Sequence, residues 1–155
     1  MRVCDLAAVS AISDAVHGRY TEPVAVYAGR LALYPAGCRV FECGGEAAGY
    51  LIAHPWHRDS PPKLGALLGA IPADADTFYL HDIALLPASR GTGAGKMALD
   101  LVVGDARALG LAEVTLMAVG GADLYWAARG FAYVPREADP SYGAGAHLMR
   151  MPVAI

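Results

Sequence analysis

Charged and aromatic residues are scarce in this sequence, and its charges are not gathered in any one segment. Of the 155 residues, 17% are charged and 8% are aromatic, and the formal net charge is −3. A domain that binds nucleic acid through its phosphates carries a basic patch or stripe. Because the chain has neither a positive net charge nor such a stripe, we expect no nucleic-acid partner.

Long apolar runs are also missing, although hydrophobic residues make up 55% of the chain. No uncharged apolar run approaches the roughly 18 residues that a membrane-spanning helix needs. The N-terminus lacks the basic and then apolar segments of a signal peptide. We therefore expect a cytoplasmic protein without a membrane partner, folded as one domain over residues 1–155. The apolar content is compatible with a homodimer.

Cysteine is rare, and its spacing matches no metal site. Cys4, Cys38 and Cys43 are odd in number, which favours reduced and mostly buried thiols over disulfides. His54 and His57 lie close together in the sequence. No third ligand of suitable spacing lies near them, so we expect no bound metal.

Glycine, in contrast, is concentrated in one short segment that is flanked by cations. Glycine has no Cβ, so its backbone N–H group can approach a ligand closely. A helical pattern opens directly afterwards, and a helix start adds unpaired N–H groups and the positive end of a dipole. A strand-to-helix turn without a ligand is the alternative, but the clustered glycines and flanking cations favour a phosphate site. This segment, the glycine loop, consists of Arg90, Gly91, Thr92, Gly93, Ala94, Gly95 and Lys96.

The spacing of the glycine loop excludes two common nucleotide motifs. A P-loop begins with a glycine and follows its Gly-Lys pair with Ser or Thr. Arg90 and Met97 stand at those positions. A dinucleotide fingerprint needs a third glycine where Lys96 stands. The ligand phosphate is therefore expected to belong to another kind of molecule.

Three segments of the chain, in the right order, resemble the GNAT superfamily of acetyl-CoA-dependent N-acetyltransferases. The glycine loop matches the R-G-x-G-x-G/A signature of that family at every position. Residues 81–87 resemble its central strand, and residues 124–131 resemble its helix followed by Gly-Phe. The resemblance runs from the first expected helix to the last expected strand. It implies an acyltransferase whose glycine loop holds the pyrophosphate of coenzyme A.

Hydrophobic periodicity and turn residues predict the order of the elements. We expect a helix after Asp5, a second helix capped by Thr21 or Glu22, and further helices over 96–109 and 123–129. We expect strands over 38–43, 47–54, 77–86, 114–119, 131–134 and 147–153. This order predicts a mixed α/β (α+β) fold of the GNAT type. It has a largely antiparallel central sheet flanked by helices, and one βαβ crossover carries the glycine loop.

The proline-rich stretch over residues 55–76 is expected to be a long surface excursion with a short helix over 64–71. A loop of such length inside a compact domain usually has a function.

The resemblance implies a binding site for acetyl-CoA. In the family, the central strand splays from its neighbour and frees main-chain groups for the pantetheine arm. Ile83, Ala84 and Leu85 would supply those groups here, while their apolar side chains also serve the core. Trp126 would shape the thioester channel or simply fill space.

His81 is the expected general base. It stands like a histidine that serves as base, directly or through water, in the arylalkylamine branch of the superfamily. Imidazole titrates near neutrality, so it can accept a proton from an ammonium group. A purely structural histidine is the alternative. Alternation along the strand predicts that His81 and Ile83 share one face, and that Asp82 and Ala84 share the other.

Tyr125 is the expected acid for the leaving thiolate. The family usually places a tyrosine four residues before the helix-ending glycine, and Trp126 stands at that position here. Tyr125 is its neighbour, about 100° around a regular helix. Either a shifted register brings Tyr125 to the sulfur, or the thiolate leaves without an enzyme acid and Tyr125 packs on the core.

The acceptor site is expected to include Glu22, Tyr79 and Asp82. Glu22 lies where the family walls its acceptor site with the first helices, although helix capping is an alternative role. Asp82 would bind a cationic substrate or relay protons, or it forms a salt bridge. The strand exit at His54 to His57 is expected to line the acceptor pocket.

These residues predict an acetyl-CoA-dependent N-acetyltransferase that acts on a primary amine of a small molecule or peptide by direct attack in a ternary complex. The alternative is a non-catalytic acyl-CoA-binding sensor or regulatory module with a GNAT fold, which the Trp126 departure supports. A nucleotide-binding domain of another class is disfavoured by the spacing of the glycine loop.

Overall fold

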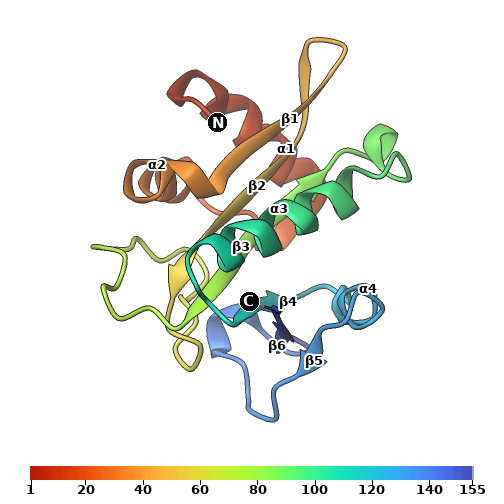
Figure 1. The fold of residues 1–155 in the computed structure, drawn as a ribbon. Helices are drawn as coiled ribbons and strands as arrows, with labels where there is room; N and C mark the ends of the chain where they lie inside the picture. Colours follow the sequence, from red (N-terminus) through yellow and green to blue (C-terminus); the bar gives the residue numbers. More distant parts are fainter. Residues whose placement is uncertain (155) are drawn as a thin grey trace.

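A mixed β-sheet with helices on both faces organises the chain (Figure 1). The structure is a computed structural model and describes residues 1–154. Within these residues the sheet has six strands in the order β1-β2-β3-β4-β6-β5, and only the central pair β3–β4 is parallel. The strands are β1 (Cys38–Cys43), β2 (Glu46–Trp56), β3 (Thr77–Leu85), β4 (Glu113–Ala118), β5 (Ala132–Tyr133) and β6 (His147–Pro152).

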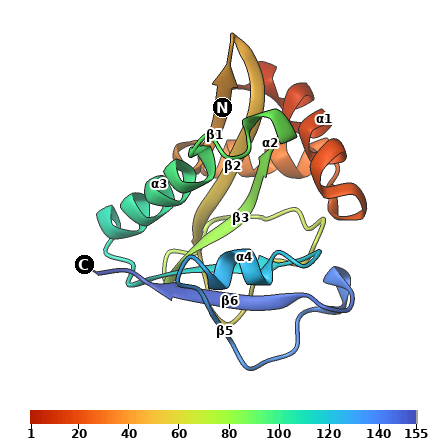
Figure 2. The same ribbon diagram turned by 90° about the vertical axis from the view of Figure 1, so that its right-hand side faces the viewer.

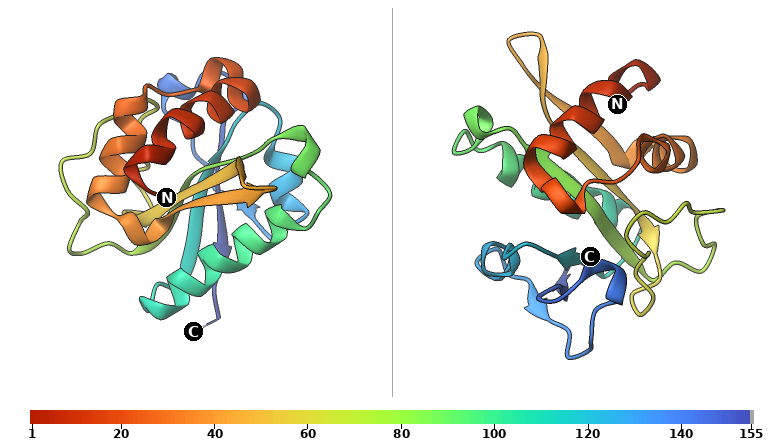
Figure 3. Two further views of the ribbon diagram at one scale, coloured as in Figure 1. Left: turned by 90° about the horizontal axis from the view of Figure 1, so that it is seen from above. Right: turned by 180° about the vertical axis from the view of Figure 1, so that it is seen from behind.

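The helices pack on both faces of the sheet and form one hydrophobic cluster on each face. The α-helices are α1 (Leu6–His17), α2 (Val24–Leu33), α3 (Ala94–Ala108) and α4 (Asp123–Ala127). Side chains of α1 and α2 pack with Tyr50 and Ile52 on one face of the sheet. Side chains of α3 and α4 pack with Leu51 and Leu80 on the other face. Figures 2 and 3 show α1 and α2 on the side of β2 and β3 opposite to α3. The predicted α+β fold with a βαβ crossover is confirmed.

Turn chemistry explains most element ends. Gly44 and Gly45 both have positive φ, 61° and 85°, in the tight turn of the β1–β2 hairpin. Two-residue hairpin loops favour such residues because their twist matches that of the strands. Gly18, with φ 54°, ends α1. The predicted hairpin and the predicted end of α1 are therefore confirmed.

Several expected details are wrong. Residues 64–71 form turns and bends rather than a helix. Pro23, not Glu22, is the N-cap residue of α2. Cys38 is buried, but Cys4 and Cys43 are exposed, so the expectation of mostly buried thiols holds only for Cys38.

A β-bulge at His81 changes the faces of β3. Ile52 pairs with Asp82 and Ala53 pairs with Leu80, so His81 is an extra residue opposite β2. A bulge sets two residues opposite one and resets the alternation of side chains. The expectation that His81 and Asp82 lie on opposite faces is therefore wrong. Both side chains reach partners on the α1–α2 side of the sheet.

The central strands separate after a short paired segment. β3 and β4 pair only at Phe78–Val114, Tyr79–Thr115 and Leu80–Leu116. Beyond Leu80 the main chain of β3 no longer pairs with β4. This divergence opens the sheet where residues 81–85 run toward the glycine loop.

Candidate functional site

A cleft of about 660 Å³ lies where β3 and β4 separate. The second half of β3 forms its floor, and the end of β4 with the following glycines forms one wall. The last turn of α1, the start of α3 and α4 also contribute side chains. Two residues from long connections also line the cleft: Leu64 from the β2–β3 connection and Tyr142 from the β5–β6 connection.

The glycine loop borders one end of this cleft. Arg90 and Gly95 line it. Gly93, with φ 90°, is the N-cap residue of α3. The first N–H groups of a helix have no intrahelical acceptors. That of Ala94 donates to the Thr92 hydroxyl at 3.4 Å, and those that follow it can meet an anion. Lys96 is largely exposed and pairs with Asp100 at 2.6 Å.

Of the other loop residues, Gly91, Thr92, Gly93 and Ala94 shape the turn beside the cleft instead of lining it. The Thr92 hydroxyl donates to the Ser89 carbonyl at 2.8 Å, which fixes this turn.

Residues 83–85 of β3 divide between the cleft and the core. Ile83 and Leu85 line the cleft, whereas Ala84 is buried with the α1–α2 cluster. The main chain of all three lies in the part of β3 that β4 has left unpaired. The Leu85 carbonyl accepts from Arg90 Nε at 3.3 Å, and the other main-chain groups that point away from β2 are available to an extended ligand.

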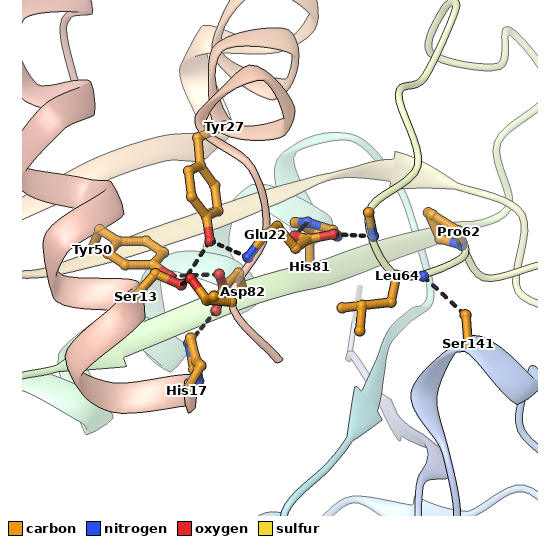
Figure 4. Close-up of polar contacts among 12 residues, drawn as sticks. Ser13, His17, Glu22, Tyr27, Tyr50, Pro62, Leu64, His81, Asp82 and Ser141 are labelled. Carbon is orange, nitrogen blue, oxygen red and sulfur yellow. Dashed lines mark hydrogen bonds and ion pairs between the residues drawn. The ribbon is translucent and has the colours of Figure 1, made fainter. Parts of the chain in front are cut away.

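His81 lies in the cleft and is held by Glu22. The His81 Nε2 and Glu22 Oε2 atoms are 2.8 Å apart, and each side chain is only 3% exposed. The backbone N–H of Gly65 donates to the other Glu22 oxygen at 2.6 Å. Figure 4 shows this chain of contacts from the loop through Glu22 to His81. Glu22, expected as a substrate group or a helix cap, is instead a buried partner of His81.

A second histidine–carboxylate pair also borders the cleft. His17 Nε2 lies 2.7 Å from Asp82 Oδ1, with side-chain exposures of 21% and 12%. The Tyr50 hydroxyl donates to the other Asp82 oxygen at 2.6 Å. Sequence reasoning missed His17, because nothing in the last turn of a helix indicates that it will meet a strand far along the chain.

The electrostatics of this second pair follow from burial and from contact between the partners. Burial lowers the pKa of His17, but the hydrogen bond and charge of Asp82 outweigh it and leave the pKa raised. Burial raises the pKa of Asp82, but the hydrogen bond and charge of His17 outweigh it and leave the pKa lowered. Both shifts favour the ion pair.

A hydroxyl network ties the two pairs to the helices. The Tyr27 hydroxyl donates to Ser13 at 2.6 Å and accepts from the Glu22 backbone N–H at 3.0 Å. Thr21 donates to the same serine at 3.0 Å. These bonds fix the connection between α1 and α2, and hence the position of Glu22 (Figure 4).

The end of α4 fixes Trp126 against Phe131. Gly130 has φ 93°, its N–H donates to the Ala127 carbonyl, and the Phe131 N–H donates to the Trp126 carbonyl. This is a Schellman cap, whose first and last residues commonly pack together. Trp126 does pack on Phe131, with ring centroids 5.4 Å apart, and only 7% of it is exposed.

Tyr125 is the more accessible of the two neighbours. It is 41% exposed and lines the cleft together with Trp126. A Cβ atom added to Gly95 would lie 2.9 Å from the Tyr125 hydroxyl. This hydroxyl therefore reaches the start of α3 and the glycine loop. The Arg129 guanidinium stacks on the Tyr125 ring, 3.3 Å from its centroid.

Some expected acceptor residues lie outside the cleft. Tyr79 is buried, and burial followed by the neighbouring Tyr142 raises its pKa. His54 is also buried, and burial, aided by His81, lowers its pKa to about 3. The strand exit at His54 to His57 does not line the cleft, so that expectation is wrong. The missed residues Leu64 and Tyr142 take its place.

Residues 1–154 contain no group of three His, Cys, Asp or Glu side chains that could hold a metal ion. None of the helices described in this part of the chain has the length and apolar character needed to cross a membrane.

A family model described as the acetyltransferase (GNAT) family matches residues 7–131. No curated protein sequence matches the chain. Among solved structures, the GNAT-like decarboxylase GphF in complex with isobutyryl-CoA is 17% identical with a TM-score of 0.80, covering 99% of this chain and 97% of that one.

Two further structures cover the whole of this chain. Ard1 from Thermoplasma volcanium is 16% identical with a TM-score of 0.73 and is covered to 95%. The ribosomal-protein-S18-alanine N-acetyltransferase from Escherichia coli is 18% identical with a TM-score of 0.69 and is covered to 92%. At these identities the likeness concerns the fold alone.

Proposed function

The chain belongs to the acetyltransferase (GNAT) family, and we propose that it transfers an acetyl group from acetyl-CoA to a primary amine by direct attack in a ternary complex. The family typically uses acetyl-CoA. The observation that carries the proposal is a cleft that has a glycine loop at one end and the His81–Glu22 pair within it. An anion-binding loop and a proton acceptor are the parts that this reaction needs.

The residues of the donor end fit coenzyme A. The start of α3 approaches Tyr125 closely, since a Cβ atom added to Gly95 would lie 2.9 Å from the Tyr125 hydroxyl. Arg90 lines the cleft beside this helix start and supplies positive charge for a pyrophosphate. Residues 83–85 pair with β2 but not with β4, so the main-chain groups on their β4 side are suited to hydrogen bonds with an extended pantetheine arm.

The cleft residues divide the proton transfers between them. Bound acetyl-CoA supplies the thioester, in which a C–S bond breaks as the C–N bond to the amine forms. His81 takes the proton that the amine nitrogen loses, and Glu22 stabilises the resulting imidazolium at 2.8 Å. Tyr125 is the candidate that returns a proton to the thiolate, because its hydroxyl lies at the start of α3. The backbone N–H groups freed from β4 can stabilise the oxyanion.

Glu22 supports this assignment by its orientation. A histidine base needs a fixed ring and a defined tautomer, which a buried carboxylate on one nitrogen provides. The carboxylate is itself fixed, since Gly65 donates to its second oxygen and Tyr27 binds its backbone. We assign Glu22 as a positioning residue that acts through His81.

Calorimetric titration with acetyl-CoA and a thiol-release assay across a panel of primary amines test the proposal. We expect binding, and thiol release only when an amine is present. Absence of acetyl-CoA binding would overturn the proposal. Binding without thiol release on any amine would instead favour the acyl-CoA sensor.

Two charge-reversal variants test whether the glycine loop binds acetyl-CoA. Arg90→Glu should weaken acetyl-CoA binding by about tenfold or more, because a cation beside the pyrophosphate becomes an anion. Arg107→Glu is the matched control. Arg107 lies in the last turn of α3, at the end away from the glycine loop, and its side chain donates to the Ala154 carbonyl at 2.8 Å. The affinity of the Arg107→Glu variant for acetyl-CoA should stay within about twofold of that of the wild type.

A further inference from the structure

Residues 62–65, which we call the strap, run past His81 at the border of the cleft (Figure 4). One side of the strap is tied to the β5–β6 connection. The Tyr142 hydroxyl donates to the Pro62 carbonyl at 2.6 Å, and the Leu64 N–H donates to the Ser141 hydroxyl at 3.1 Å. Leu64 itself lines the cleft.

The other side of the strap is tied to the connection between α1 and α2. The Gly65 N–H donates to Glu22 Oε1 at 2.6 Å, across 43 residues of sequence. Gly65 has φ 76°, a conformation that side-chain-bearing residues rarely adopt. The strap therefore joins two walls of the cleft, and its last contact is with the carboxylate that holds His81.

A second contact narrows the same part of the cleft. The ring of Tyr20 lies over Gly120, where an added Cβ would be 3.5 Å from the ring. This contact joins the 3₁₀ helix Gly18–Tyr20, which follows α1, to the connection between β4 and α4. The space beside His81 is thus bounded by the strap and by the Tyr20–Gly120 contact.

We propose that the acceptor is a small free amine and that polypeptides are excluded. The inference rests on the proposed acetyl transfer. When the amine belongs to a polypeptide, the rest of the chain has to pass out of the cleft, and this requires the strap to lift. Lifting the strap breaks the hydrogen bond between Gly65 and Glu22. Glu22 uses its other oxygen for His81, so opening the strap also loosens the base. A small amine fits beneath the closed strap and leaves this pair intact.

The lining of this space suggests the character of the small amine. Val16, Tyr20, Leu64 and Tyr142 offer apolar or aromatic surface for a compact carbon body. Asp82 is kept ionised by its contacts with His17 and attracts the ammonium form of the amine. The acceptor class is therefore a compact, mainly apolar primary amine that arrives as a cation.

The test compares the same amino group in a small molecule and in a peptide. Amides of phenylalanine, leucine and alanine are assayed by thiol release against hexapeptides that begin with the same residues. For the best substrate pair we expect kcat/KM to be at least about tenfold higher for the amide. Peptides that react as fast as their amides would overturn this inference while leaving acetyl transfer intact. No transfer to either class would overturn the proposed function and this inference with it.

Strap variants test the cause of the preference. Ser141→Ala combined with Tyr142→Phe removes two tethers and leaves Glu22 and His81 unchanged. The amide-to-peptide ratio should fall at least about threefold, because a loosened strap admits longer chains. Ser141→Ala alone changes an exposed residue and should lower the ratio in the same direction if the double variant folds poorly.

Lys63→Ala is the matched control in the same strap. Its side chain is largely exposed, and its ion pair with Asp139 is long, at 3.9 Å. Such pairs contribute little, so the ratio should not change. An unchanged ratio in the Ser141 and Tyr142 variants, or an equal fall in Lys63→Ala, would contradict the strap as the selecting element.

Discussion

The pairs His81–Glu22 and His17–Asp82 are alike in chemistry and differ in burial. Both join an imidazole to a carboxylate within 2.8 Å, and both border the same cleft. His81–Glu22 is almost fully buried, while His17–Asp82 keeps partial contact with solvent. A buried imidazole held by a fixed carboxylate is suited to proton transfer, because water does not compete for it. A partly solvated ion pair is better suited to holding α1 on β3 and to attracting a cation.

Replacement of each histidine gives the sharpest test of this division. His81→Asn should lower kcat by about 10²- to 10⁴-fold, the usual contribution of a general base. His17→Asn should lower kcat by less than about tenfold, because its pair is assigned to positioning and attraction. Thiol release measures both, with acetyl-CoA binding and circular dichroism as controls for folding. Equal losses of kcat in the two variants would contradict the different roles assigned to the two histidines.

Replacement of each carboxylate separates orientation from stability. Glu22→Gln should lower kcat by about 10²-fold, because His81 loses the charge that orients it. Asp82→Asn should affect kcat less and raise KM for a cationic amine, because it removes the attracting charge. The KM for acetyl-CoA should change in neither variant. A Glu22→Gln enzyme with normal kcat would show that His81 does not depend on its partner.

Removal of the Tyr50 hydroxyl tests how far His17–Asp82 serves the fold. Tyr50→Phe loses a bond of 2.6 Å to the Asp82 carboxylate. A hydrogen bond to a charged group contributes about 1.5–3 kcal/mol, so the free energy of unfolding should fall by that amount. Urea denaturation measures the change. The kcat should stay near that of the wild type, and a large loss of kcat would instead give the second pair a direct part in the reaction.

The smallest expected effect is the dependence of stability on pH. The pKa of His17 is raised on folding, so its contribution is full below the unfolded value, about 6.5. That contribution is lost as the pH rises through the folded value. The pKa of Asp82 is lowered on folding, so its contribution is full above about 3.9 and is lost as the pH falls through the folded value.

Both contributions are therefore complete between about pH 4 and pH 6.5. The difference in free energy of unfolding between the wild type and His17→Asn should be larger at about pH 5.5 than at about pH 8.5. His57→Asn is the matched control, because that histidine is more exposed and lies 3.6 Å from Asp74. A difference that does not change with pH would mean that His17 is not ionised in the folded protein.

The order of the elements followed from local signals. Glycines that adopt positive φ ended α1 and turned the β1–β2 hairpin, and alternating apolar residues marked the strands. Residues 64–71 misled the prediction, because an apolar run was interrupted by Gly65 and Gly69. Those glycines favour the turns that the structure has there.

The glycine loop could be proposed as a phosphate site from the sequence because its chemistry is local. Its N–H groups, its small residues and its cation belong to consecutive positions, and the following helix adds its own N–H groups. The acceptor end could not be assigned in this way. Glu22 and His81 are 59 residues apart, and the bulge that turns His81 and Asp82 to one side has no sequence signature.

The sequence by itself determined the family, the fold class and the position of the glycine loop between β3 and α3, since short-range spacing and propensity specify each of them. Only the tertiary structure decided that Glu22 holds His81, that His17 meets Asp82 and that the strap joins two walls of the cleft. The physical reason is that these contacts join side chains from distant segments. Their geometry depends on one extra residue in β3 and on the packing of α1 and α2 against the sheet.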